Sequence, residues 1–151
     1  MKIEVATETD LAQILDLQKS CYVEEAELYD DFNIPPLTQT LKAIESDFNK
    51  ELFLKIESEG KIIGSVRGYL EEGTCKIGRL IVNKDFRNRG LGKLLMKEIE
   101  SKFSLAHRFE LFTGHKSSRN ISLYNKLGYT EFEKRPVNEK LELVFLEKTN
   151  M

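Results

Sequence analysis

The segment that decides the fold reads Leu80-Ile81-Val82-Asn83-Lys84-Asp85-Phe86-Arg87-Asn88-Arg89-Gly90-Leu91-Gly92-Lys93. An apolar run typical of a strand ends there, a short loop rich in arginine and glycine follows, and the apolar stripe of a helix begins near Gly90. The first turn of a helix carries unpaired N–H groups and a partial positive charge, and glycine lets a phosphate approach that backbone closely. Three cations, Arg87, Arg89 and Lys93, lie beside it. The segment therefore predicts a strand, loop and helix unit that binds phosphate.

Two other phosphate-binding motifs are excluded by single positions. A P-loop needs glycine five residues before its Gly-Lys pair and serine or threonine after it, but this chain has Arg87 and Leu94 there. A dinucleotide-binding fingerprint that begins at Gly90 needs its third glycine where the chain has Leu95. Neither of these nucleotide-binding folds is therefore expected.

Apolar spacing and turn residues on both sides of this segment predict the element order β-α-α-β-β-β-α-β-α-β-β. Expected strands cover residues 2–6, 52–57, 62–70, 75–82 and 109–113, with two more around 136–139, and expected helices start at or just after Thr7, Thr38, Gly90 and Ser117. Thr7 followed by Asp10 is typical of a helix N-cap, and Thr38 is the expected cap of the second helix. A strand, a crossover helix and a strand between residues 75 and 113 predict one parallel pair in an otherwise antiparallel sheet.

Length and composition indicate one domain over residues 1–151. A chain of this length can bury a single core without a metal or disulfides. No apolar run approaches the ~18 residues of a membrane span, and the N-terminus lacks the layout of a signal peptide. We therefore expect a cytoplasmic protein with no membrane partner. Cys21 and Cys75 form no paired motif and are expected to be free thiols.

Charge is distributed unevenly along the chain. Residues 1–50 hold 4 basic and 11 acidic side chains and residues 76–126 hold 12 and 4, although the whole chain has a net charge of only −2. Such a split is compatible with ligands of opposite charge meeting in one molecule, while many of these charges simply face solvent. The basic part lacks interleaved aromatic residues, so no nucleic-acid partner is expected.

Two motifs carry a family resemblance. Arg87-x-x-Gly90-x-Gly92, after Leu80-x-Val82, resembles the acetyl-CoA signature of the GNAT superfamily of N-acetyltransferases. The run Asn120-Ile121-Ser122-Leu123-Tyr124-Asn125-Lys126-Leu127-Gly128-Tyr129 is similar to the second signature of that family, a helix that ends Leu-Tyr-x-x-Leu-Gly-Phe/Tyr. The element order matches over essentially the whole chain. The resemblance implies a mixed α/β fold, with a mostly antiparallel sheet, a central splayed parallel strand pair and flanking helices.

The resemblance also implies site residues. Backbone groups of Leu80, Ile81 and Val82 would pair with the pantetheine arm, and one of them near Ile81 or Val82 would stabilise the oxyanion. Tyr124 would be the acid that protonates the departing thiolate. The implied cofactor-binding residues are Leu80, Ile81, Val82, Arg87, Asn88, Arg89, Gly90, Leu91, Gly92, Lys93, Ser117 and Asn120.

The chain departs from the family pattern at three positions. Many relatives have asparagine seven residues before the tyrosine, where this chain has Ser117, while Asn120 lies one helical turn before Tyr124. Either residue is a candidate cofactor contact. A glutamate base found in some relatives aligns with Lys76, so no base is transferred, and the usual proline after the strand is Lys84.

Candidate acceptor contacts are acidic or aromatic. The run from 24 to 31 contains five acids and no base, and in the family this segment overhangs the acceptor site. The candidates are Glu24, Glu25, Glu27, Tyr29 and Glu71. His107 and His115 have no cysteine or carboxylate at ligand spacing, so no metal site is expected.

The sequence as a whole predicts an acetyl-CoA-dependent N-acetyltransferase. It would transfer the acetyl group to a primary amine, that of a small cationic molecule, by direct attack in a ternary complex. One alternative is acetylation of a protein N-terminus or lysine. A second alternative is a non-catalytic module that binds acetyl-CoA. A homodimer is compatible with each of these functions.

Overall fold

The computed structural model describes residues 2–151 as one sheet with helices on both faces. The strands are β1 (Ile3–Val5), β2 (Leu52–Ser58), β3 (Lys61–Glu71), β4 (Thr74–Val82), β5 (Arg108–Gly114), β6 (Thr130–Pro136) and β7 (Glu142–Thr149). The helices are α1 (Leu11–Tyr29), α2 (Pro35–Thr38), α3 (Leu41–Phe48), α4 (Leu91–Lys102) and α5 (Ser118–Lys126), with 3₁₀ turns η1 (Glu8–Asp10) and η2 (Lys84–Phe86).

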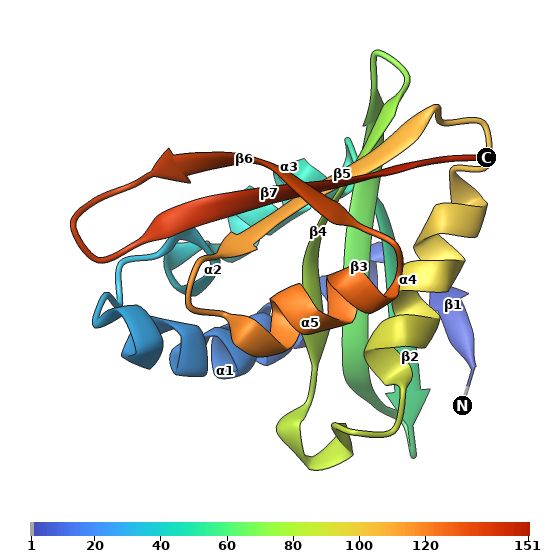
Figure 1. Ribbon diagram of the computed structural model, residues 1–151. Helices are drawn as coiled ribbons and strands as arrows, with labels where there is room; N and C mark the ends of the chain where they lie inside the picture. Colours follow the sequence, from blue (N-terminus) through green and yellow to red (C-terminus); the bar gives the residue numbers. More distant parts are fainter. Residues whose placement is uncertain (1) are drawn as a thin grey trace.

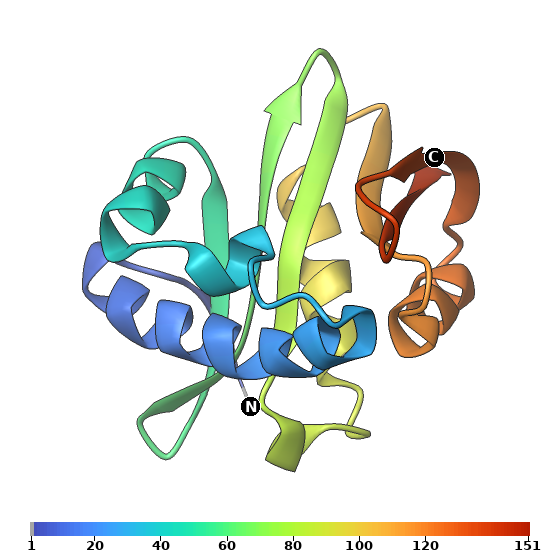
Figure 2. The same cartoon turned by 90° about the vertical axis from the view of Figure 1, so that its left-hand side faces the viewer.

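The strands follow the order β1-β2-β3-β4-β5-β7-β6 across the sheet. All neighbours are antiparallel except β4 and β5, which run parallel because α4 crosses over between them. Helices α4 and α5 lie on one face of the sheet and α1, α2 and α3 on the other (Figure 1, Figure 2). The expected mixed, mostly antiparallel sheet with one central parallel pair is confirmed.

The parallel pair is joined at one end only. Pairing runs from Thr74 with Arg108 to Lys76 with Glu110 and then stops. Beyond this point β4 continues to Val82 paired only with β3, and β5 pairs only with β7. The two strands therefore diverge, as expected, and leave unpaired backbone along the centre of the sheet.

Two apolar cores hold the helices against the sheet. The core under α4 and α5 contains Leu91, Leu95, Met96, Ile99, Phe109, Leu111, Tyr124 and Tyr129. The core under α1 and α3 contains Leu11, Ile14, Leu15, Ile44 and Phe53. Burying such side chains contributes roughly 1.5–3 kcal/mol each, so the two cores fix the positions of the helix ends that surround the diverging strands.

The start of the second helix corrects one expectation. Pro35 begins the single turn of α2, and Thr38 lies inside that turn instead of capping the next helix. The side-chain oxygen of Thr40 accepts a hydrogen bond from the Ala43 N–H at 3.1 Å and caps α3. The sequence pattern missed this because proline at the first position of a helix starts an extra turn before the apolar spacing resumes.

The predicted cap Thr7 precedes the 3₁₀ turn η1, and helix α1 itself begins at Leu11, directly after this turn. The Asp10 carboxylate accepts a hydrogen bond from the Thr7 N–H at 2.8 Å and so closes the first turn. Although α1 has 19 residues, neither it nor any other helix within residues 2–151 is long and apolar enough to cross a membrane. The cytoplasmic location stays a prediction.

Candidate active site

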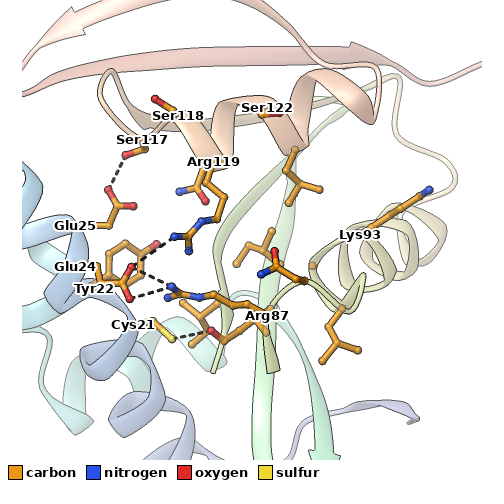
Figure 3. A pocket seen from close by; sticks show the side chains of 18 of the residues that line it. Cys21, Tyr22, Glu24, Glu25, Arg87, Lys93, Ser117, Ser118, Arg119 and Ser122 are labelled. Carbon is orange, nitrogen blue, oxygen red and sulfur yellow. Dashed lines mark hydrogen bonds and ion pairs between the residues drawn. The ribbon is translucent and has the colours of Figure 1, made fainter. Parts of the chain in front are cut away.

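A cavity of about 650 Å³ opens where β4 and β5 diverge. Its walls come from the C-terminal half of α1, the end of β4, the loop that leads into α4, and α5 (Figure 3). The structure brings together most of the residues that the sequence predicted for the cofactor and two predicted for the acceptor. These are Leu80, Ile81, Val82, Arg87, Asn88, Gly90, Leu91, Gly92, Lys93, Ser117, Asn120, Glu24 and Glu25.

The loop before α4 presents backbone N–H groups to this cavity. Asn88 and Gly90 have φ angles of 62° and 76°, in the left-handed region, and this turns the chain sharply into α4. The first helical hydrogen bond is donated by Leu94 to the Gly90 carbonyl at 3.1 Å. The N–H groups of the first turn, from Leu91 to Lys93, therefore have no acceptor within the helix. Together with the helix dipole they suit an anion such as a pyrophosphate.

A carboxylate already contacts two cations of the cavity. Both oxygens of Glu24 accept hydrogen bonds from Arg87, at 2.9 and 3.0 Å. Arg119, at the start of α5, lies 3.9 Å from the same carboxylate (Figure 3). Glu24 thus bridges the phosphate-binding loop and α5, and a phosphate would compete with it for both arginines.

Glu25, like Glu24, already has a hydrogen-bond partner. Its carboxylate accepts a hydrogen bond of 2.6 Å from the Ser117 hydroxyl. The hydroxyl groups of Ser117 and Tyr29 are 2.8 Å apart, and Tyr29 also accepts a hydrogen bond from the Lys116 N–H at 2.9 Å. Burial raises the pKa of Tyr29. These contacts tie the end of α1 to the junction between β5 and α5, which fixes one wall of the cavity.

Tyr124 is on α5 but does not line the cavity, although Asn120 and Leu123 of the same helix do. Its side chain is 7% exposed and belongs to the core under α4 and α5. Burial raises the pKa of Tyr124, and the nearby Tyr22 and Glu25 raise it further. The side chain is therefore held in its protonated form, as a proton donor must be.

Four other predicted residues do not line this cavity. Arg89 is exposed and stacks over Phe86 at 5.0 Å. Glu27 is exposed on α1, Tyr29 is buried in the contacts described above, and Glu71 is exposed at the end of β3. Glu27 points away from the cavity that Glu24 and Glu25 line, because successive residues of a helix lie on different sides of its axis. Their roles in binding stay predictions.

The structure adds lining residues that sequence reasoning missed. They include Cys21, Phe86, Lys116 and Arg119. The Cys21 thiol donates a hydrogen bond to the Val82 carbonyl at 3.4 Å, and burial raises its pKa to about 11. Arg119 belongs to the basic part of the chain and directly precedes the second motif. This position could have identified Arg119 as a candidate cofactor contact.

Lys76, which aligns with the base of some relatives, forms an ion pair. Its Nζ lies 2.9 Å from a carboxylate oxygen of Glu110 on β5. The Lys76 and Arg108 cations lower the pKa of Glu110, although burial opposes this. This pair closes the end of the sheet where β4 and β5 still meet.

Comparisons with known proteins agree with this geometry. Residues 11–129 match the model of the acetyltransferase (GNAT) family. The chain is 27% identical over 121 residues to UPF0157 protein YqkA of Bacillus subtilis, covering 80% of this chain but only 35% of that protein. It is 28% identical over 131 residues to acetyltransferase YE1169 of Yersinia enterocolitica, covering 85% and 87% of the two chains.

A solved structure extends the likeness to the whole fold. PaiA N-acetyltransferase from Thermoplasma acidophilum, in complex with coenzyme A, aligns with a TM-score of 0.71 over 99% of both chains at 19% identity. The family model covers most of the chain, so the protein belongs to the acetyltransferase (GNAT) family. It is an acetyl-CoA-dependent N-acetyltransferase.

Proposed function

We propose that this protein transfers the acetyl group of acetyl-CoA to a primary amine by direct attack in a ternary complex. One observation carries the proposal: a single cavity joins the anion-binding start of α4 to the end of β4 that no longer pairs with β5, and α5, the helix that carries Tyr124, forms one of its walls. Bound acetyl-CoA supplies an acetyl group activated as a thioester. The other elements of the reaction come from the chain.

The residues around the cavity fit acetyl-CoA. Unpaired N–H groups at Leu91 to Lys93 and the side chains of Arg87, Lys93 and Arg119 would hold its phosphates. The backbone of β4 has no strand on its β5 side beyond Lys76 and is free to pair with an extended arm. Gly90 has open space where a Cβ would lie, which leaves room for a phosphate.

The chain assists the transfer at two points. A neutral amine nitrogen forms a bond to the acetyl carbon, the carbon–sulfur bond breaks, and the amine loses a proton to solvent. A backbone N–H near Ile81 or Val82 stabilises the negative charge that develops on the carbonyl oxygen. The Tyr124 hydroxyl gives its proton to the departing sulfur and regains one from water.

A small cationic amine is part of the proposal, because two acids of α1 line the cavity, although both already have partners. Glu24 is bonded to Arg87, and Glu25 is bonded to Ser117. Acetylation of a protein N-terminus or lysine is the alternative for the same cavity. The homodimer stays a prediction.

Replacing Tyr124 with phenylalanine tests the proposal. The Tyr124→Phe variant keeps the ring in the core but removes the proton donor, so kcat should fall roughly 10²–10⁴-fold, less where water substitutes, while the Kd for acetyl-CoA stays nearly constant. Release of the free thiol with a panel of amines, polyamines and peptides measures kcat, and calorimetry measures Kd. An unchanged kcat with chemistry rate-limiting removes Tyr124 from the mechanism. If the wild type acetylates no amine, the non-catalytic module is favoured.

A further inference from the structure

A second cavity lies beside β4 near the point where this strand stops pairing with β5. It has a volume of about 260 Å³ and is lined mainly by residues of β3, β4 and β5, with Asp47 of α3. Helix α3 lies with α1 and α2 on one face of the sheet (Figure 2). The volume is at the low end of the roughly 300–1,000 Å³ of small-molecule sites. A metabolite of modest size fits such a space better than a folded protein surface does.

Gly78 opens the floor of this cavity at the point where the sheet divides. It follows Lys76, the last residue of β4 that pairs with β5. A Cβ built on Gly78 meets no atom within 4 Å, and its φ lies outside the left-handed region. The backbone here thus does not require glycine, and the missing side chain leaves open space in the lining of the second cavity.

Two residues of β4 form a bulge directly after Gly78. Arg79 and Leu80 together oppose Val66 of β3, and Arg79 has a φ of 50°. A bulge of this kind turns a side chain out of the strand's regular alternation. The Nε of Arg79 is buried and has no hydrogen-bond partner within residues 2–151. A buried N–H without a partner is costly, so Arg79 is suited to a ligand that accepts a hydrogen bond.

Most charges of the second cavity are paired with each other. Arg67 is 3% exposed and donates to Asp47 and Gln18, each at 2.8 Å. Lys76 pairs with Glu110 at 2.9 Å.

Two opposite charges of this cavity have no such partner. Neither Glu51 nor the guanidinium of Arg79 forms an ion pair or a side-chain hydrogen bond in the part of the chain described. Burial raises the pKa of Glu51, and the charges of Arg67 and Arg79 oppose this rise. The cavity therefore offers one negative and one positive group that a ligand can satisfy.

The remaining wall is aromatic. The rings of Phe112 and Phe145 are 5.3 Å apart, and Phe112 is 51% exposed. Such a surface suits an apolar group of the ligand. Tyr22 of α1 lines the first cavity and is influenced by two cations of the second: burial raises its pKa, and the charges of Arg79 and Arg67 oppose this rise.

We infer that the second cavity binds the acceptor, and that it selects a small amine that also carries an anionic group, such as an α-amino acid. Glu51 faces the ammonium group, Arg79 binds the anion, and the open space at Gly78 lets the amine approach the acetyl group. This inference rests on the proposed acetyl transfer. It replaces a simply cationic acceptor with a zwitterionic one, because the unpaired charges of the cavity have both signs.

Matched substrates test the charge selection. Thiol release is measured with the common L-amino acids, each paired with the amine that lacks its carboxylate. For at least one pair, kcat/KM should be roughly ten- to a hundred-fold higher for the amino acid, as expected for a charge-assisted hydrogen bond. Arg79→Gln should remove this preference, because it should lower kcat/KM for the amino acid and leave kcat/KM for the matching amine unchanged. Lys134→Gln, which removes a positive charge from an exposed site lining neither cavity, is the control and should keep it.

Filling the cavity tests its location. Gly78→Val places a side chain well suited to a strand into open space, so the protein should fold and bind acetyl-CoA with wild-type Kd. Its kcat/KM for the preferred acceptor should fall at least about tenfold, with Gly78→Ala intermediate. Thermal unfolding confirms that both variants are folded.

Three outcomes overturn the inference while leaving acetyl transfer intact. They are wild-type turnover by folded Gly78→Val, equal losses for both members of a pair in Arg79→Gln, and acetylation of polyamines or peptides but of no amino acid. The second outcome would show that Arg79 acts on the acetyl group, which is common to all the reactions, and does not bind the acceptor's carboxylate. Absence of turnover with every amine tested contradicts the proposed function itself.

Discussion

The contact between Glu24 and Arg87 predicts that removing a negative charge strengthens cofactor binding. Glu24 holds Arg87 through two hydrogen bonds and lies 3.9 Å from Arg119. Each phosphate of acetyl-CoA would compete with this carboxylate for the same cations. In Glu24→Gln the two arginines lose that competitor, so acetyl-CoA should bind more tightly.

The exposure of the ion pair limits the size of this effect. The side chains of Arg87 and Glu24 are 22% and 48% exposed. Two charges about 4 Å apart in water attract by about 1 kcal/mol, and exposed ion pairs contribute roughly 0.2–1 kcal/mol when measured. The Kd should therefore fall by a factor of roughly 1.4–5. Most of this gain should disappear near 1 M salt, where the screening length is about 3 Å.

Calorimetric titration of acetyl-CoA at low and high salt measures the effect. Glu27→Gln is the matched control, because it removes the same charge from an exposed position of the same helix that does not line the cavity. Weaker binding by Glu24→Gln would show that Glu24 orients Arg87 and does not compete with the cofactor. A change equal to that of Glu27→Gln would show only a general effect of net charge.

Three further predictions concern the backbone and the thiols. Gly90→Glu places a carboxylate at a φ of 76° beside the anion site and should weaken acetyl-CoA binding at least about tenfold in calorimetry; wild-type affinity in the folded variant would refute the site. Gly114→Ala puts a Cβ in steric conflict with the Tyr29 hydroxyl and should lower the free energy of unfolding by about 1–3 kcal/mol in urea; unchanged stability would show that Tyr29 moves freely. Burial raises the thiol pKa values of Cys21 to about 11 and Cys75 to about 12, from 9.0. The unfolded chain therefore loses these protons first, so stability should fall as the pH rises above about 9, and less steeply in the double alanine variant; equal slopes would contradict this.

The fold was largely predictable because its decisive signals are local. The glycines and cations between β4 and α4 mark a helix start, and apolar spacing distinguishes strands from helices on both sides. The extra turn of α2 was not predictable from spacing alone, because Pro35 competes with Thr38 for the role of helix start. The insertion of β7 between β5 and β6 depends on contacts between distant segments and has no local signal.

The grouping of the loop before α4 in one cavity was predictable from the sequence, and the contacts of the acidic residues on α1 were not. Residues of the loop before α4 are consecutive, so one motif identifies them together. The contact of Glu24 with Arg87 joins residues far apart in sequence, and only the folded chain shows that this acid is already engaged. Gly78 is inconspicuous in the sequence, because an ordinary strand glycine and one that opens a cavity look the same until the surrounding side chains are placed.

The short pairing between β4 and β5 makes the centre of this sheet unusual. Sheet edges normally lie at the periphery, but here two edges face each other in the interior, because the strands separate after Lys76 and Glu110. Amide hydrogens along these inner edges should exchange with deuterated solvent faster than those of β2 or β3. An extended ligand that pairs with β4 would slow this exchange, because it would act as a temporary strand along an edge that has no partner in the sheet.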